Sequence, residues 1–304
     1  MINETTAATA VAAHRAPVIE FDAVTKRYAP PPGAPRPDRP AVDSFSATVP
    51  SGSTTVLLGS SGCGKTTLLR MVNRMVEPTG GRILLDGEDV LARDPVGLRR
   101  SIGYVMQNGG LLPHRRVIDN ITLVPRLCET DRATARHRAH ELMEMLGLDG
   151  DLAGRYPHQL SGGQAQRVGV ARALAADPGV LLMDEPFGAV DPLVRRELQR
   201  ELIGIQANLA KTIVFVTHDV DEALTLGDEI ILLREGARIA QRGTGDELVA
   251  APVDDFVVRF LGLEDARRAL RLAEVAGRRV VQDETGRTLG VLDAAHDTPA
   301  GGRT

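Results

Sequence analysis

The feature that most constrains the fold is a glycine-rich stretch at residues 59–67, which reads Gly-Ser-Ser-Gly-Cys-Gly-Lys-Thr-Thr. An apolar run at 55–58 precedes it, and apolar residues at helical spacing follow it at 68–75. Glycines let successive backbone N–H groups turn toward phosphate oxygens, and the following helix adds the positive end of its dipole. Strand, loop and helix in this order predict a loop that holds a triphosphate. The alternative is a glycine- and serine-rich turn that matches by chance.

Length and charge limit the classes of protein to consider. The 304 residues suffice for one large α/β domain with an appendage, or for two modest domains. A net charge of -4 gives no basic field, so we expect no nucleic-acid partner. No apolar run approaches the roughly 18 to 20 residues that a membrane-spanning helix needs. Cys63 and Cys128 are two isolated cysteines, and both are predicted to be free thiols.

The first fifty residues predict a tail followed by two strands. Residues 1–17 lack the basic n-region of a signal peptide, so we predict a disordered tail and a cytoplasmic protein. Alternating apolar residues predict antiparallel strands at 18–28 and 41–49, joined by an exposed, proline-rich connector at 29–40. Tyr28 ends the first strand. It is either a core or rim aromatic, or a ring that stacks on a base.

Residues 114–160 are predicted to be mostly helical, as an insert in the α/β domain. Asp119 is expected to cap a helix over 120–127, and Asp131 a second helix that runs to residue 146. Further along, Leu-Ser-Gly-Gly-Gln at 160–164 precedes a helix predicted over 165–176. Such a helix start presents a hydroxyl and bare N–H groups to an anion; the alternative is an ordinary N-cap.

Three apolar runs predicted to be buried strands are each followed at once by polar residues: Gln107 after 102–106, Asp184 and Glu185 after 180–183, and His218 after 212–217. The carboxyl ends of parallel strands meet at one edge, where ligands bind in α/β sheets. Adjacent carboxylates on a strand end point in different directions, so Asp184 can hold magnesium while Glu185 addresses a water. A lone histidine is more often structural, but the position of His218 at a strand end favours a functional role.

The sequence resembles the ATP-binding subunits of ABC transporters over residues 18–262. The motifs that carry the resemblance are, in chain order, the loop at 59–67, Gln107, Leu-Ser-Gly-Gly-Gln at 160–164, Asp184 with Glu185, and His218. The combination of this loop with Leu-Ser-Gly-Gly-Gln is not expected of kinases or GTPases. Four further segments are similar to importers, particularly those for glycine betaine, carnitine, choline or proline-type osmoprotectants: 102–105, 112–114, 155–159 and 183–188.

The resemblance implies the architecture of an α/β P-loop NTPase. It predicts a RecA-like core, an N-terminal antiparallel β-subdomain, and a helical subdomain at about residues 108–176, all within an ATP-binding domain at 18–262. Residues 263–304 would be a C-terminal tail. Its segment 280–292 is similar to one hairpin of a CBS regulatory module, and we expect a remnant of such a module.

The resemblance also implies the site. ATP would contact residues of the loop and of the first strand end: Tyr28, Gly59, Ser60, Ser61, Gly62, Cys63, Gly64, Lys65, Thr66 and Thr67. Tyr28 would stack on adenine and Lys65 would contact the β- and γ-phosphates. Mg²⁺ would be held by Thr66, Asp184 and Gln107. Glu185 would be the general base, Gln107 a sensor of water and metal, and His218 a contact to the γ-phosphate.

The family works as head-to-tail dimers, so a second copy would complete the site with five residues: Ser161, Gly162, Gly163, Gln164 and Asp191. One departure is Ala165, where a supporting glutamine is usual. Membrane permease subunits would contact Gln107 and residues 108–130, which places the chain at the cytoplasmic face of the membrane. A solute-binding protein would be an indirect partner.

Two alternatives remain open. An importer ATPase for another solute, such as an amino acid or a polyamine, would share every catalytic residue. A soluble ABC ATPase that acts on ribosomes or DNA usually carries two cassettes or a long coiled-coil insert. This chain has one set of motifs and no sustained heptads or basic arm, which favours the transport ATPase.

Overall fold

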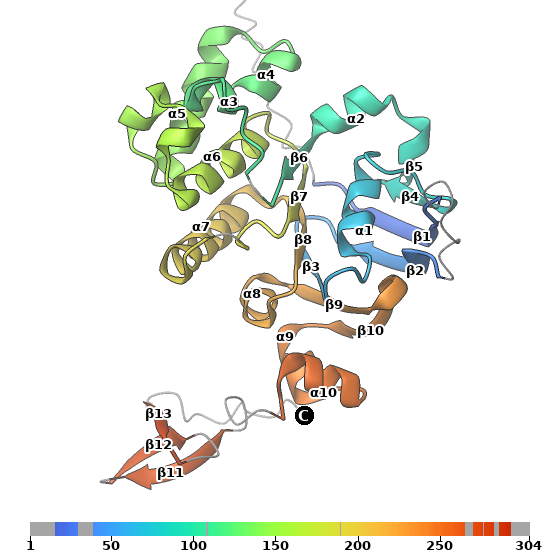
Figure 1. Cartoon of the computed structure of the whole chain (residues 1–304), viewed down its shortest axis with the longest axis vertical. Coiled ribbons are helices and arrows are strands. Elements are labelled where there is room, and N and C mark those ends of the chain that lie inside the picture. The colour runs from blue at the N-terminus through green and yellow to red at the C-terminus, as the bar shows by residue number, and fades with distance from the viewer. Residues whose placement is uncertain are drawn as a thin grey trace, which may run out of the picture. The chain divides into compact units, whose positions relative to one another are not determined.

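The computed structural model describes residues 16–29, 39–107, 109–188, 190–264, 270–275, 277–282 and 286–292. The chain divides into two compact units, residues 1–245 and 246–304 (Figure 1). Most of the predicted tail at 1–17 and of the connector at 29–40 lies outside the described residues. No helix in the described ranges is long and apolar enough to cross a bilayer.

The centre of the first unit is a six-stranded sheet in the order β10-β9-β3-β8-β7-β6. Its strands are β3 (Thr54–Gly59), β6 (Ile102–Val105), β7 (Val180–Asp184), β8 (Thr212–Thr217), β9 (Glu229–Arg234) and β10 (Arg238–Gly243). Only β10 is antiparallel to its neighbour. Every residue of β3, β7 and β8 is buried, as expected of continuous apolar runs in a sheet covered on both faces. The carboxyl ends of the parallel strands therefore meet at one edge.

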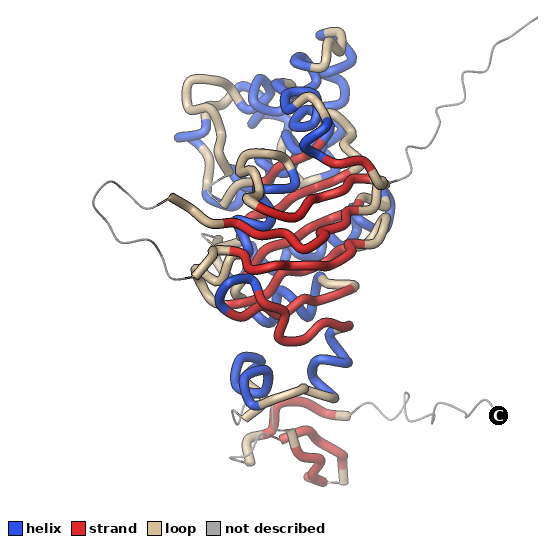
Figure 2. Tube along the Cα trace, turned by 90° about the vertical axis from the view of Figure 1, so that its right-hand side faces the viewer, coloured by secondary structure: helices blue, strands red, loops and turns tan. Residues whose placement is uncertain are grey.

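A second, antiparallel sheet has the order β2-β1-β4-β5. It consists of β1 (Ile19–Lys26), β2 (Val42–Val49), β4 (Gly80–Leu85) and β5 (Glu88–Asp89), so both predicted N-terminal strands are confirmed. Helix α1 (Lys65–Val72) shares one apolar core with both sheets, and Phe21 and Phe45 meet edge to face in it at 5.2 Å. Figure 2 shows the strands of this unit lying side by side.

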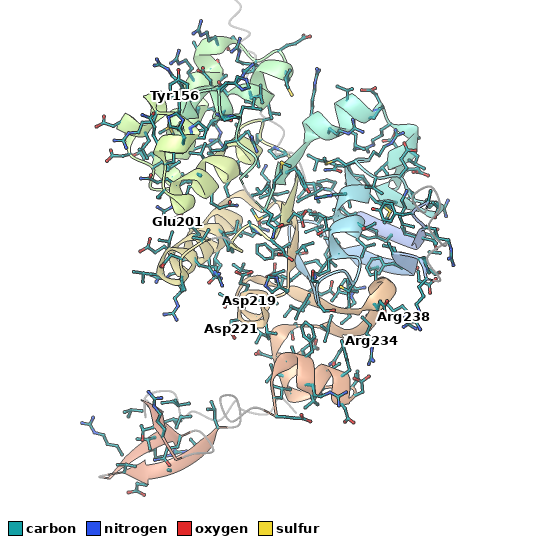
Figure 3. All side chains as sticks on the ribbon, in the orientation of Figure 1. Tyr156, Glu201, Asp219, Asp221, Arg234 and Arg238 are labelled. Atoms are coloured by element: carbon teal, nitrogen blue, oxygen red, sulfur yellow. The ribbon has the colours of Figure 1, made fainter. Side chains whose placement is uncertain are left out.

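The helical insert lies beyond β6, at the edge of the six-stranded sheet, and its last helix packs against that strand (Figure 1). After η1 (Val90–Ala92) and α2 (Pro95–Ser101), it comprises α3 (Val117–Ile121), α4 (Leu123–Leu127), α5 (Arg132–Met145), η2 (Gly150–Gly154), η3 (Pro157–Gln159) and α6 (Gly162–Leu174). Helices α7 (Pro192–Leu209) and α8 (Val220–Leu226) follow. Arg167 on α6 pairs with Glu201 on α7 at 2.9 Å, which ties these two helices together (Figure 3).

Two helix starts differ from the prediction: α6 begins at Gly162 and not at residue 165, because Ser161 is its N-cap, and α3 begins before Asp119. Asp119 lies inside α3, which begins at Val117 with Arg116 in the N-cap position. Burial explains the earlier start, because Val117, Ile118 and Ile121 are all buried and the Val117 N–H donates to the carbonyl of Arg155. The predicted cap at Asp131 is confirmed: its Oδ1 accepts from the N–H groups of residues 133 and 134.

The second unit contains α10 (Asp255–Leu261) and most of α9 (Gly245–Ala250). It also contains a three-stranded antiparallel sheet in the order β11-β12-β13, formed by β11 (Arg271–Val275), β12 (Arg278–Gln282) and β13 (Thr288–Val291). Strands β12 and β13 are the hairpin expected at 280–292, whereas β11 was not expected. The division at residue 245 lies before the boundary expected at 262. The relation of this tail to a CBS module stays a prediction.

Candidate functional site

The glycine-rich loop connects β3 to α1, as its pattern predicts. Gly64, in the N-cap position of α1, has a φ of 115°, in a region that residues with a Cβ rarely adopt. A Cβ there would lie 2.5 Å from the carbonyl oxygen of Ala41. The other side of the loop is held by the N–H of Ala237, which donates to the Cys63 carbonyl at 2.6 Å. At residue 64 the loop thus passes between two backbone segments that leave no room for a side chain.

Lys65 is buried at the start of α1. Its Nζ donates to the carbonyls of Gly59 at 2.7 Å and Ser60 at 2.8 Å. Its third donor faces Cys63 Sγ at 3.9 Å, a weak contact that an oxygen of a ligand inside the loop can replace. The neighbouring Cys63 is a free and buried thiol, and burial raises its pKa against the opposing charge of Lys65. Cys128, the other free thiol, is exposed.

Asp184 ends β7 and is buried beside the loop. The Thr66 hydroxyl donates to its Oδ1 at 2.8 Å, and the Tyr104 hydroxyl donates to its Oδ2 at 3.1 Å. Arg70 Nη2 lies 3.5 Å from the same Oδ2. Burial raises the pKa of Tyr104, which keeps this hydroxyl protonated and able to donate. The result is a carboxylate and a hydroxyl held together at the end of the phosphate loop.

Glu185 is contacted from both neighbouring strand ends. Gln107, just after β6, donates from Nε2 to Glu185 Oε2 at 3.2 Å. His218, just after β8, places Nδ1 at 3.3 Å from the same oxygen. Glu185 itself has a φ of 44°, a left-handed conformation that is uncommon outside glycine and typical of functional sites. The structure therefore brings together Gln107, Asp184, Glu185 and His218, as expected from three strand ends at one edge.

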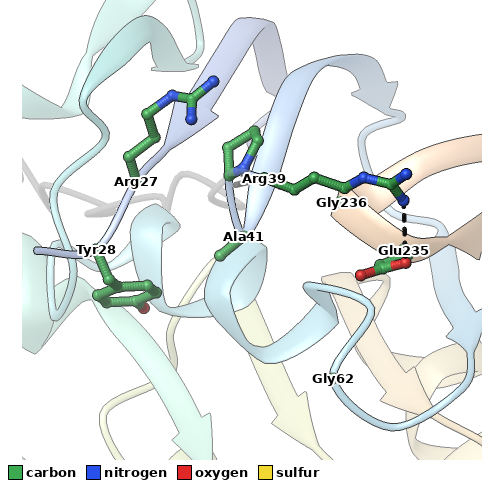
Figure 4. A pocket seen from close by; sticks show the side chains of 8 residues that line it. Arg27, Tyr28, Arg39, Ala41, Gly62, Glu235 and Gly236 are labelled. Atoms are coloured by element: carbon green, nitrogen blue, oxygen red, sulfur yellow. Dashed lines mark hydrogen bonds and ion pairs between the residues drawn. The ribbon is translucent and has the colours of Figure 1, made fainter. Parts of the chain in front are cut away.

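Tyr28 is 47% exposed at the end of the first sheet and lies over the loop, with its hydroxyl 3.4 Å from the hydroxyl of Thr67. It lines a depression of about 200 Å³ whose other walls come from the loop, the start of β2 and the β9–β10 connection: Arg27, Arg39, Pro40, Ala41, Gly62, Glu235 and Gly236. Figure 4 shows Tyr28 and the Arg39–Glu235 ion pair on opposite sides of Ala41.

Residues 161–164 form a capping box at the start of α6. The N–H of Gln164 donates to Ser161 Oγ at 3.2 Å, and the N–H of Ser161 donates to Gln164 Oε1 at 2.9 Å. A Cβ on Gly163 would lie 2.6 Å from Val194 Cγ1, so a larger residue there would displace the Val194 side chain on α7. Asp191 caps α7 through the N–H of Leu193. In the described part of the chain, neither Asp191 nor the capping box makes a hydrogen bond or ion pair with the loop at 59–67.

Comparisons with known proteins decide the family. The profile of the family described as ABC transporter matches residues 42–188. The glycine betaine uptake system ATP-binding protein YehX of Escherichia coli is 47% identical over 260 residues, which cover 85% of this chain and 82% of YehX. The chain belongs to the ABC transporter family. The osmoprotectant import ATP-binding protein OsmV of Salmonella typhimurium is 49% identical over 84% of this ABC chain and 66% of OsmV.

A solved structure agrees with this ABC assignment. The dimeric structure of a post-hydrolysis state of the ATP-binding cassette MJ0796, bound to ADP and Pi, is 31% identical with a TM-score of 0.66. The match covers 75% of this chain and 98% of that one. The predicted fold class and the resemblance to osmoprotectant importer subunits are confirmed. The chain spans 58% to 66% of the length of three curated relatives that it matches.

The structure adds residues around the candidate site that the sequence did not indicate. Tyr104 and Arg70 contact Asp184 across about 80 and 114 positions of sequence, a separation that leaves no local pattern. Arg172 on α6 donates to the carbonyls of Gly110 at 2.7 Å and Gly109 at 2.8 Å, which anchors the turn after Gln107. Burial lowers the pKa of Arg172.

Proposed function

We propose that this chain is the ATP-hydrolysing subunit of an ABC importer for an osmoprotectant of the glycine betaine, carnitine, choline or proline type. The observation that carries the catalytic part is the position of Glu185. Its Oε2 is held between Gln107 and His218, one residue after the Asp184 carboxylate that accepts from Thr66. A carboxylate held in this way is placed to take a proton from an attacking water.

The loop supports the binding of ATP because its backbone N–H groups and Lys65 supply hydrogen-bond donors that suit phosphate oxygens. Backbone N–H groups of residues 59–67 would surround the phosphates, and Lys65 would turn the donor that now faces Cys63 Sγ toward the β- and γ-phosphates. The exposed ring of Tyr28 stacks on adenine beside Gly62. His218 contacts the γ-phosphate while its other neighbour, Glu185, addresses the water.

Mg²⁺ fits the donor set beside the loop. The Thr66 hydroxyl and the Asp184 carboxylate present oxygen atoms 2.8 Å apart, and Mg²⁺ prefers oxygen ligands, of which phosphates and water usually supply several. Thr66 and Asp184 would hold the ion, and the Gln107 amide oxygen would join them. When bound, Mg²⁺ neutralises the charge that develops on the phosphates.

The chain acts as a head-to-tail dimer in this proposal. Within one chain, the capping box at 161–164 makes no hydrogen bond or ion pair with the loop among the described residues, whereas its hydroxyl and N–H groups suit a phosphate. A second copy would bring Ser161, Gly162, Gly163, Gln164 and Asp191 to the loop of the first. The dimeric state of the MJ0796 cassette supports this arrangement.

The relatives named above support the proposed membrane partner and solute. Permease subunits would dock near Gln107 and along residues 108–130, where the exposed apolar side chains of the adjacent Met106 and of Leu127 offer contact area. The chain would then lie at the cytoplasmic face of the membrane, with a solute-binding protein as an indirect partner.

The uptake of labelled solutes tests this proposal. We expect deletion of the gene to abolish osmolality-dependent uptake of glycine betaine or choline, and the Glu185→Gln variant to fail to restore it. Uptake of a labelled amino acid and of spermidine is the control and should not change. Loss of amino-acid or polyamine uptake, with betaine and choline uptake intact, would assign the other solute class. Association with ribosomes or DNA and with no membrane protein would contradict the transport function.

A further inference from the structure

Arg195 links the Asp191 segment, at the start of α7, to the His218 segment, at the end of β8. It lies on α7, four residues after Asp191, and its side chain is 26% exposed. Its Nη2 donates to the carbonyl of Val190 at 3.4 Å, directly before Asp191. Its Nη1 donates to Asp219 Oδ2 at 3.3 Å, directly after His218. One guanidinium therefore reaches both the Asp191 segment and the His218 segment.

The residues on either side of His218 are held by the same network. The N–H of Asp219 donates to Thr217 Oγ1 at 3.0 Å, and that hydroxyl donates to Glu222 Oε2 at 2.6 Å. Asp219 Oδ1 also caps α8 by accepting from the N–H groups of residues 221 and 222 (Figure 3). A shift of Asp219 or Glu222 consequently moves the backbone that carries His218, whose Nδ1 lies 3.3 Å from Glu185.

One pair of groups in this network lies beyond hydrogen-bonding distance. Arg195 Nε is buried and has no hydrogen-bond partner, while Glu222 Oε1 lies 3.7 Å away. Glu222 is a buried carboxylate, and the same guanidinium faces both Glu222 and Asp219. If α7 moved slightly toward α8, the distance from Arg195 Nε to Glu222 Oε1 would shorten to the ~2.9 Å of an ordinary hydrogen bond, and Nε would gain a partner. The contact is thus one that displacement of the Asp191 end of α7 could make or break.

We propose that Arg195 is a positioning residue that couples the Asp191 segment to His218, so that docking of a second copy at Asp191 sets His218 against Glu185 and the γ-phosphate. The inference rests on the proposed dimeric ATPase. Arg195 itself touches neither nucleotide nor water in this account. It acts through Asp219 and Glu222 on the backbone of His218.

The test compares Arg195→Gln with Arg200→Gln, an exposed arginine on the same helix, in the full chain. We expect Arg195→Gln to lower kcat at least tenfold, with less than a twofold change in the Kd for a fluorescent ATP analogue. Arg200→Gln should leave both unchanged. Arg195→Lys should recover little, because one ammonium cannot reach the two separated acceptors, Val190 and Asp219, that the guanidinium fork contacts. Unchanged kcat in a folded Arg195→Gln variant would overturn the proposal.

A double-mutant cycle separates coupling from simple structural support. If Arg195 acts through His218, adding Arg195→Gln to His218→Ala lowers kcat no further. If the losses of kcat in the two single variants multiply in the double variant, the coupling is contradicted. The coupling is also contradicted if the fall in kcat only follows the fraction of unfolded protein in a thermal melt. An absence of ATP hydrolysis by the wild-type chain would instead overturn the proposed function, so the two failures are distinguishable.

Discussion

The loop at 59–67 predicts a large difference between two glycine substitutions that share a positive φ. Gly64 has a φ of 115°, and a Cβ on it would meet the Ala41 carbonyl oxygen at 2.5 Å and Ala237 Cβ at 3.1 Å. Gly87, in the turn between β4 and β5, has a φ of 79° with nothing within 4 Å. Gly87→Ala therefore carries the conformational cost alone, about 1–2 kcal/mol. Gly64→Ala adds an overpacking cost of about 1–3 kcal/mol.

The two variants should be compared by urea unfolding and by thermal melts. The additional ~2 kcal/mol for Gly64→Ala corresponds to a Tm lower by about 4–8 °C than that of Gly87→Ala. We also expect Gly64→Ala to lose ATP binding under conditions where it is still folded, because the displaced backbone carries the phosphate-binding N–H groups. Equal stability of the two variants would refute the argument that Ala41 and Ala237 leave no space at residue 64.

Two further predictions concern groups that line the same loop. The first uses a Cys128→Ser variant and follows the alkylation of Cys63 by iodoacetamide with mass spectrometry. The rate should be slow at pH 8 and rise only at higher pH, because burial raises the pKa of this thiol and lowers its thiolate fraction. Equal rates for Cys63 and for the exposed Cys128 of the wild type would contradict this. The second concerns Tyr28 and is measured by calorimetry. Tyr28→Ala should weaken ATP binding by about 1–3 kcal/mol through loss of stacking, whereas Tyr28→Phe should bind ATP as the wild type does. An equal loss in both variants would indicate that the hydroxyl, and not the ring, binds ATP.

The sequence was sufficient to predict the site residues that belong to a local pattern, such as a glycine-rich loop or a strand end. The glycine pattern predicts the loop because a strand and a helix flank it, and apolar runs predict the strands whose ends carry Gln107, Asp184, Glu185 and His218. Their convergence follows from the parallel register, in which Asp184 pairs with Val216 and Leu58 pairs with Thr217.

Local pattern fails where tertiary contacts decide. Asp119 has the chemistry of a cap, yet burial of Val117 starts α3 earlier. The pairs formed by Tyr104 with Asp184 and by Arg39 with Glu235 join segments 80 and 196 positions apart, so nothing near either residue predicts them. Arg195 was not predicted for the same reason, because the carboxylates that it faces, Asp219 and Glu222, lie at a distant strand end and on another helix.

The role of Glu185 is the central claim, and single-turnover hydrolysis by Glu185→Gln tests it most directly. Glutamine keeps the size of the side chain and an oxygen for Gln107, but it cannot accept the proton of the attacking water. We predict unchanged binding of ATP, hydrolysis slowed by at least ~10²-fold, and accumulation of an ATP-bound dimer on size-exclusion chromatography. Hydrolysis at the wild-type rate in this variant would contradict the assignment of Glu185 as the general base.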